Sequence, residues 1–254
     1  MVSNSFLVSL SFLSGAAFGS FANVCIYRIP RNLSVVAPRS FCPHCGRTLS
    51  WYELIPVLSF LILRGRCRTC RGPISVRYPL VELAVAIVGL WLLTKDGPTL
   101  DALVKLLIFV LLLIIAVIDW NTLTIPNGLI IAGLVLGALS SCLSSIHVLM
   151  NAALSAVLAS GFTLIVRMMG NFTFKKETMG LGDVKLAGLI GLFIGFEQFL
   201  LAVWLSAIIG IIYWIALRVL ARAGRNAKLP FGTFLTAAFL LVYLTPVPIF
   251  SIVF

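Results

Sequence analysis

The chain has 254 residues, of which 61% are apolar and only 11% are charged, and its mean hydropathy is +1.12. These values exclude a soluble enzyme, a disordered region, a coiled coil and collagen, because a soluble protein must show water a largely polar exterior. An outer-membrane barrel would need strands of alternating polarity, whereas the apolar runs here are continuous and rich in Leu, Ile and Ala. The composition therefore predicts an all-α polytopic membrane protein.

The net charge of +11 comes from 19 basic and 8 acidic residues. In a soluble protein this excess would suggest nucleic acid, but in a membrane protein basic residues typically flank the cytoplasmic ends of spans. We therefore expect membrane lipid, and no nucleic acid, among the partners of the chain.

Long apolar stretches divide the chain into about eight expected spans, most of them near the roughly 20 residues that cross a bilayer. No basic residue precedes the first stretch, so it is expected to be a permanent span rather than a cleaved signal peptide. The stretch 184–196 is too short to cross unaided, and a count one lower or one higher stays open. The expected spans cover residues 6–29, 78–94, 100–118, 127–149, 150–169, 184–196, 198–220 and 232–254.

Nearly all basic residues fall in three groups: in the loop after the first expected span, between the fifth and sixth spans, and after the seventh. If successive spans alternate in direction, all three groups lie on one face of the membrane. Because basic residues mark cytoplasmic loops, we expect both termini outside and the long first loop in the cytoplasm.

Two C-x-x-C pairs lie in this first loop, with 21 residues between them. This is the spacing of a zinc ribbon, in which two tight turns each present two thiolates to one metal ion. Disulfides are the alternative, but a reducing cytoplasm opposes them. Four thiolates fill the coordination shell, so the expected zinc is structural. Its ligands would be Cys42, Cys45, Cys67 and Cys70.

Two aspartates are placed by this threading at the same, cytoplasmic border: Asp119 closes the third expected span and Asp183 opens the sixth. Gly180 and Gly182 beside Asp183 permit irregular backbone and close approach of another chain. Two carboxylates that share a site divide into one base and one acid, which is aspartic protease chemistry. Each could also be a helix end facing water, or both could form a proton relay. The sequence alone leaves open whether they meet.

Motifs along nearly the whole chain resemble the type IV prepilin peptidases, bifunctional leader peptidases and N-methyltransferases of the GxGD aspartyl protease type. One position departs from the family pattern, since residues 125–127 read IPN where members often have LPD. The matching motifs, besides the two cysteine pairs, are residues 19–30 (GSFANVCIYRIP), 55–60 (IPVLSF), 64–67 (RGRC), 74–79 (ISVRYP) with Glu82, Asp119 with 125–126 (IP), 180–185 (GLGDVK) and 228–235 (KLPFGTFL).

The resemblance implies that Asp119 and Asp183 are the catalytic pair. It implies cleavage of the short basic leaders of prepilins and pseudopilins at the cytoplasmic border of a bacterial inner membrane, in type IV pilus or type II secretion systems. It also implies methylation of the new N-terminal residue from S-adenosylmethionine. Residues 1–95 would then form the methyltransferase-associated region and residues 96–254 a six-span peptidase domain.

The binding site for the methyl donor has no recognisable motif, because no G-x-G-x-x-G sequence follows a strand. Four polar residues near the first loop and the adjoining span ends are the expected donor-binding groups: Asn23, Glu53, Tyr78 and Glu82. The two glutamates could accept a proton from the amine, or simply pair with arginines. Two alternatives stay open: a transporter in which Asp119 and Asp183 relay protons, and a peptidase-only GxGD intramembrane protease.

Overall fold

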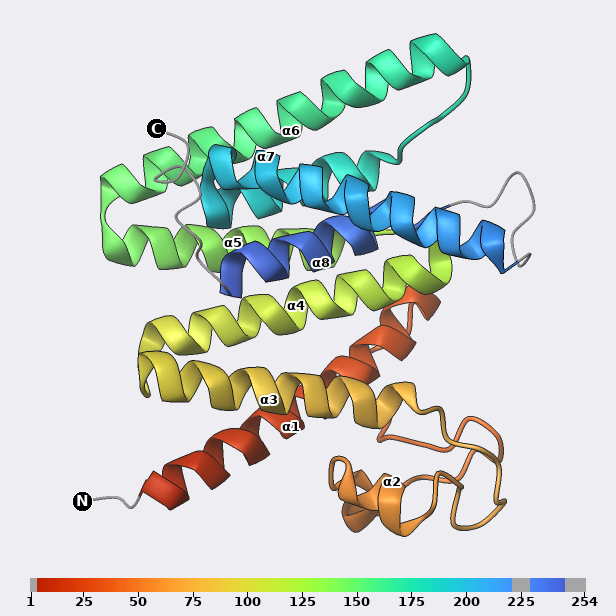
Figure 1. Ribbon diagram of the computed structural model, residues 1–254. Helices are drawn as coiled ribbons and strands as arrows, with labels where there is room; N and C mark the ends of the chain where they lie inside the picture. The colour runs from red at the N-terminus through yellow and green to blue at the C-terminus, as the bar shows by residue number, and fades with distance from the viewer. Residues whose placement is uncertain (1–3, 221–228, 245–254) are drawn as a thin grey trace. The chain divides into compact units, whose positions relative to one another are not determined.

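The computed structural model of the chain describes residues 4–220 and 229–244, and its regular elements are all helices, with no strand among these residues (Figure 1). The chain divides into two compact units, Met1–Ile114 and Ile115–Phe254. The first contains α1 (Asn4–Arg28), the short α2 (Leu58–Ile62), α3 (Arg77–Asp96) and the beginning of α4 (Leu100–Thr122). The second contains the end of α4, then α5 (Asn127–Ser144), α6 (Ile146–Phe174), α7 (Leu181–Val219) and α8 (Phe231–Leu244).

Helices α1 and α3 of the first unit pack with their backbones in contact at two glycines. A β-carbon built on Gly19 would lie 2.6 Å from the Cα of Glu82, and one on Gly15 would lie 2.9 Å from the Cα of Ala86. Only a glycine fits at such a crossing, and small residues commonly allow this approach between membrane helices. The crossing places the polar residues of α1 beside those of α3. The amide nitrogen of Asn23 accordingly donates to the Tyr78 carbonyl at 3.0 Å.

The turn between α3 and α4 is closed by a charged cluster. Lys105 Nζ lies 2.7 Å from Asp96 Oδ2 and 2.6 Å from Asp101 Oδ2. Lys105 falls inside an expected span, where an unpaired ammonium would be costly. The two carboxylates compensate its charge and tie the end of α3 to the first turns of α4.

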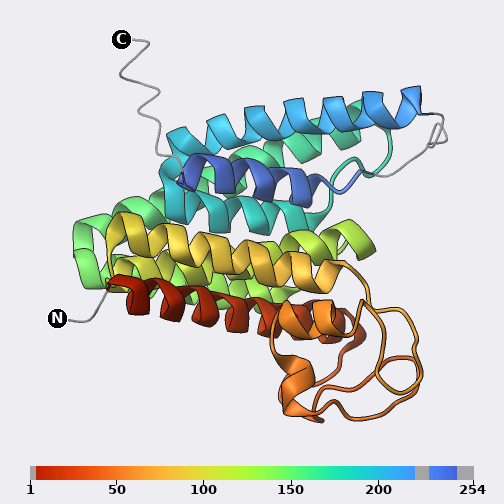
Figure 2. The ribbon, with the colours of Figure 1, turned by 60° about the horizontal axis from the view of Figure 1, so that its bottom comes forward.

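Helix α7 of the second unit reverses direction at Gly195, whose backbone is non-helical (φ 79°, ψ 164°). Figures 1 and 2 show its teal first arm and its blue second arm running antiparallel, with α8 beside them. The break falls at the end of the expected span 184–196, just before the expected span 198–220 begins. A glycine suits this position because its φ is positive. An aromatic cluster of Trp120, Tyr213 and Phe234 joins α4, the second arm of α7 and α8, with centroid distances of 5.3 Å and 5.4 Å from Tyr213 to its two neighbours.

Six helices are long and apolar enough to cross a membrane, counted over the described residues: Val8–Arg31, Arg77–Asp96, Leu100–Thr122, Asn127–Ser144, Ile146–Phe174 and Leu181–Val219. Helix α8 is shorter, with 14 residues. The prediction of an all-helical, multi-pass membrane protein is confirmed, whereas the count of eight spans stays a prediction. Residues 221–228, with several basic residues of the third group, and the end of the expected span 232–254 lie outside the described residues.

Candidate active site and cofactor cavity

Asp119 lies in the last turn of α4 and is 5% exposed. Its Oδ2 accepts a hydrogen bond from the backbone N–H of Thr233 at 2.8 Å. The Thr233 hydroxyl lies 3.1 Å from the same oxygen and 3.0 Å from the carbonyl of Ala116. The first turn of α8 thus holds the Asp119 carboxylate in one orientation.

Asp183 lies in the first turn of α7, where its Oδ2 accepts a hydrogen bond from the N–H of Gly180 at 3.2 Å. Gly182 allows this helix start to approach the loop between α4 and α5, since a β-carbon there would lie 3.1 Å from the Cβ of Ile125. The loop that precedes α7 is held from α6, because Arg167 Nε donates to the Met179 carbonyl at 2.8 Å.

The two aspartates meet at Gly232. A β-carbon built on Gly232 would lie 3.0 Å from Asp119 Oδ2 and 3.1 Å from Asp183 Oδ1. Carboxylates from α4 and α7, separated by more than sixty residues in the chain, therefore flank one backbone position. This juxtaposition is what the sequence left open, and it provides the two closely spaced carboxylates that acid–base chemistry requires.

Gly232 and Thr233 were missed as site residues by sequence reasoning, although both belong to the quoted motif 228–235. The only available signal was a Gly-Thr pair at the start of an apolar helix, which is equally typical of ordinary helix starts. Asn127 stands where members of the resembling family often have an aspartate. Its Oδ1 accepts a hydrogen bond from Lys185 Nζ at 2.8 Å. That bond links the starts of α5 and α7 without an acidic residue.

Replacing Gly232 by Ala is expected to lower peptide cleavage at least about tenfold, because the new methyl group would push against both carboxylates and small displacements of reacting groups are costly. Gly128→Ala is the matched control, since a β-carbon on Gly128 meets no atom of the described part of the chain within 4 Å. Initial rates at equal amounts of folded protein measure the effect. Equal rates for the two variants would show that the space at Gly232 is irrelevant to the reaction.

The four cysteines of the first loop come together, with all sulfur atoms within 4.8 Å of one another. The two C-x-x-C turns repeat the same backbone pattern: the N–H of Cys42 donates to Arg47 O at 2.9 Å, and that of Cys67 to Gly72 O at 2.8 Å. The N–H groups of Cys70 and Thr69 lower the pKa of the Cys67 thiol to about 6, which favours the thiolate that a metal needs. The expected clustering is confirmed, and four sulfur ligands suit zinc.

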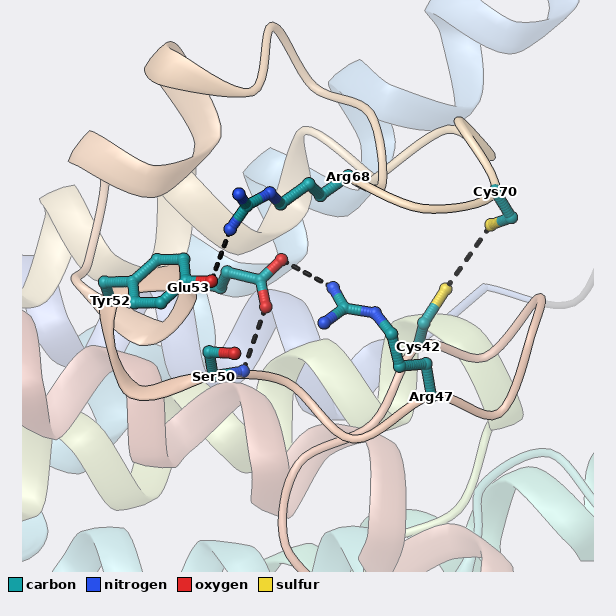
Figure 3. A network of polar contacts seen from close by, with 7 residues as sticks. All are labelled: Cys42, Arg47, Ser50, Tyr52, Glu53, Arg68 and Cys70. Atoms are coloured by element: carbon teal, nitrogen blue, oxygen red, sulfur yellow. Dashed lines mark hydrogen bonds and ion pairs between the residues drawn. The ribbon is translucent and has the colours of Figure 1, made fainter.

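Glu53 joins the first cysteine turn to the helical turn Trp51–Leu54 (Figure 3). Its Oε1 lies 2.6 Å from Arg47 Nη2, and its Oε2 accepts the N–H of Ser50 at 2.9 Å. The Arg47 guanidinium lowers the pKa of this buried carboxyl. Nearby, Arg68 donates to the hydroxyl of Tyr52. Both oxygens of Glu53 therefore already have partners, and one of them is an arginine.

A cavity of about 430 Å³ lies within the first unit, between α1, the cysteine loop and the start of α3. All four residues predicted to bind the methyl donor line it: Asn23, Glu53, Tyr78 and Glu82. Cys42 and Cys67 line it as well, so the cysteine cluster forms part of the wall. A volume of this size is typical of sites for small organic ligands, which occupy about 300–1,000 Å³.

Comparison with known proteins agrees with both parts of this arrangement. Residues 13–95 match the bacterial peptidase A24 N-terminal domain, and residues 106–215 match the type IV leader peptidase family. A prepilin leader peptidase/N-methyltransferase of Bacillus subtilis is 35% identical over 238 residues, which cover 94% of each chain. The chain belongs to the type IV leader peptidase family. The predicted family is thereby confirmed, and the names of these relatives pair the same two activities that the motifs implied.

Two further relatives carry the same name. The protein from Vibrio cholerae is 33% identical over 253 residues, covering 94% of this chain and 96% of its own. The protein from Myxococcus xanthus is 38% identical over 212 residues, covering 81% of this chain but only 62% of its own length. No solved structure gives a significant match. The apolar helices and these relatives together indicate a multi-pass inner membrane protein.

Proposed function

We propose that this chain cleaves the short basic leaders of type IV prepilins and pseudopilins and then methylates the new N-terminal residue. The observation that carries the proposal is the meeting of the Asp119 and Asp183 carboxylates around Gly232, in a chain whose relatives are named for leader cleavage and N-methylation. The family match also disfavours the transporter alternative. The matched N-terminal domain disfavours a peptidase without methylation.

For cleavage, we propose Asp119 and Asp183 as the catalytic pair. The unprotonated carboxylate accepts a proton from a water molecule, whose oxygen attacks the carbonyl carbon of the scissile bond. The protonated partner gives its proton to the nitrogen as the carbon–nitrogen bond breaks. The N–H of Thr233 orients Asp119 for these proton transfers, and the N–H of Gly180 orients Asp183. Gly232 itself adds no side-chain atom between the carboxylates, and the Cδ1 of Ile125 lies as close to this position as the two aspartates do.

For methylation, the residues around the cavity of the first unit fit a donor of the size of S-adenosylmethionine. When bound, this cofactor supplies an electrophilic methyl carbon on a sulfonium sulfur. Asn23, Glu53, Tyr78 and Glu82 would hold it, and the Glu53–Arg47 pair would keep the cysteine loop closed over the cavity. Zinc on the four cysteines would stiffen a loop that has little apolar core of its own.

The membrane topology follows from the distribution of basic residues and belongs to the same proposal. Both termini would lie outside, and the cysteine loop and the two aspartates would lie at the cytoplasmic border of the inner membrane. The substrate would enter as an apolar helix from the surrounding lipid, with its basic leader in the cytoplasm. Residues 1–95 would serve methylation and residues 96–254 cleavage.

Incubation of the purified full-length protein in detergent with a prepilin and methyl-labelled S-adenosylmethionine tests both activities at once. We expect a shortened pilin that carries the label on its N-terminal amine, as mass spectrometry would identify. Label without cleavage, or a pilin that stays uncut, would contradict the proposed peptidase. A shortened pilin without label would reduce the proposal to leader cleavage alone.

A further inference from the structure

The side chain of Asn23 is 2% exposed, and its buried Oδ1 has no hydrogen-bond partner among the residues that the structure describes. Its Nδ2 donates to the carbonyls of Tyr78 at 3.0 Å and Gly19 at 3.4 Å. Two carbonyl partners fix which end of the amide is the nitrogen, since a carbonyl can only accept. A buried acceptor without a donor is costly, so this orphan oxygen on the cavity wall indicates a missing N–H or O–H group.

Glu82 is the second acceptor at this end of the cavity and is 8% exposed. Its Oε2 accepts the N–H of Val57 at 2.7 Å. Among the residues that the structure describes, no lysine or arginine lies within ion-pair distance of it. Glu53, on the same cavity, differs because Arg47 balances its charge. A buried carboxylate without a counter-ion favours a cationic ligand.

The two acceptors are close neighbours because of the helix crossing. Asn23 follows Gly19 by one turn on α1, and Glu82 follows Tyr78 by one turn on α3. Gly19 packs against Glu82, and Asn23 bonds to the carbonyl of Tyr78. One turn rises about 5.4 Å, so both side chains reach the same region of the cavity. This region combines a neutral acceptor, a carboxylate and the nearby Ser20. Four arginines also line the cavity, but among the residues that the structure describes none of them forms an ion pair with Glu82.

We infer that this end of the cavity binds the α-ammonium group of the methyl donor, with Asn23 Oδ1 and the Glu82 carboxylate accepting its N–H bonds. The inference rests on the proposed methyltransferase function and adds how the donor is oriented. An ammonium group supplies three donors and one positive charge, which matches an orphan acceptor beside an uncompensated carboxylate. The ligand at Asn23 must be small, because the Asn23 side chain is almost completely buried and a larger group would have no room to reach it. The nucleoside would then extend toward the loop side of the cavity.

Two ligands that differ only in the amino-acid portion show whether Asn23 and Glu82 bind the ammonium group or merely maintain the shape of the cavity. S-adenosylhomocysteine carries an α-ammonium and an α-carboxylate group, whereas 5′-methylthioadenosine keeps the nucleoside and the thioether but lacks both. The Glu82→Gln variant then tests the ammonium group, because removing a negative charge from the site weakens only the binding of a cation. Calorimetric titration of the full-length protein in detergent measures both affinities without turnover. We expect the wild type to bind S-adenosylhomocysteine at least about tenfold more tightly, as a charge-assisted bond to a buried carboxylate implies.

Glu82→Gln is expected to weaken S-adenosylhomocysteine at least about tenfold and to change methylthioadenosine less than about twofold. Asn23→Ala should act in the same direction with a smaller factor. Glu53→Gln is the comparison within the same cavity, because it removes a carboxylate that already has a cation; it should weaken both ligands by a similar factor. Retained binding of methylthioadenosine reports that the Glu82→Gln and Asn23→Ala variants are folded, and an unchanged melting temperature reports it for Glu53→Gln.

Equal effects of Glu82→Gln on the two ligands, or no effect on either, would overturn the inference while leaving the methyltransferase proposal intact. A wild type that binds neither ligand would instead refute a donor site in this cavity, and with it the inference. A wild type that binds both ligands equally would show that the ammonium group is not recognised.

Discussion

Asp119→Asn should lower leader cleavage by at least about a thousandfold, because an amide can neither accept a proton from water nor deliver one to the leaving nitrogen. The fold should survive the change, since the amide oxygen of asparagine can still accept the N–H of Thr233. Asp183→Asn should have a comparable effect, and its amide oxygen can still accept the N–H of Gly180. Cleavage rates on a purified prepilin, at matched melting temperature, measure both losses.

The control for these two variants is a carboxyl-to-amide change on a different acidic residue of the same unit. Glu177 suits this purpose because its side chain is 87% exposed and its ion pair with Arg167 is 3.6 Å long. Glu177→Gln should cleave at nearly the wild-type rate. Full cleavage by either Asp119→Asn or Asp183→Asn would remove that residue from the catalytic pair. Methylation of a pilin that already lacks its leader should persist in both variants, because the cavity of the first unit contains neither aspartate.

Cys42→Ser or Cys67→Ser should release one bound zinc ion per chain and reduce methylation at least about tenfold, since loss of a ligand commonly costs most of the affinity of a structural site. Both cysteines are buried and line the cavity, so the wall of the proposed donor site would loosen. Cleavage should survive in part, because both aspartates belong to the other compact unit. Metal analysis combined with the two activity assays gives the result.

Cys142→Ser is the matched control for the cysteine variants, because Cys142 is exposed on α5 and lies outside the cluster. It should keep both the zinc and the methylation. Removal of the metal from the wild type by a chelator should reproduce the cysteine variants, and added zinc should reverse the loss. A wild-type protein that contains no zinc after gentle purification would refute this account of the loop.

Much of the fold and of the candidate sites could be predicted from residues that are close together in the sequence. Continuous apolar runs predict membrane helices because each span must satisfy its own backbone, whatever surrounds it. The paired cysteines predict one metal cluster because a C-x-x-C turn leaves few ways to place its two sulfur atoms. Even the reversal at Gly195 falls at the end of an expected span, close to the polar pair Glu197 and Gln198. The motif order added the family, which the comparisons confirm.

Contacts between distant segments could not be predicted in the same way, because they depend on how helices pack rather than on any local preference. That Asp119 and Asp183 meet depends on Gly232, which leaves room between them, and on Thr233, which binds one of them. The shared cavity of Asn23 and Glu82 depends on two glycines that bring α1 against α3. The sequence likewise could not tell the two glutamates apart: Glu53 has an arginine partner, whereas Glu82 has none among the described residues, since only the folded loop brings Arg47 to one of them. Residue types and spacing thus determined the chemistry available to this chain, and helix packing decided which groups act together.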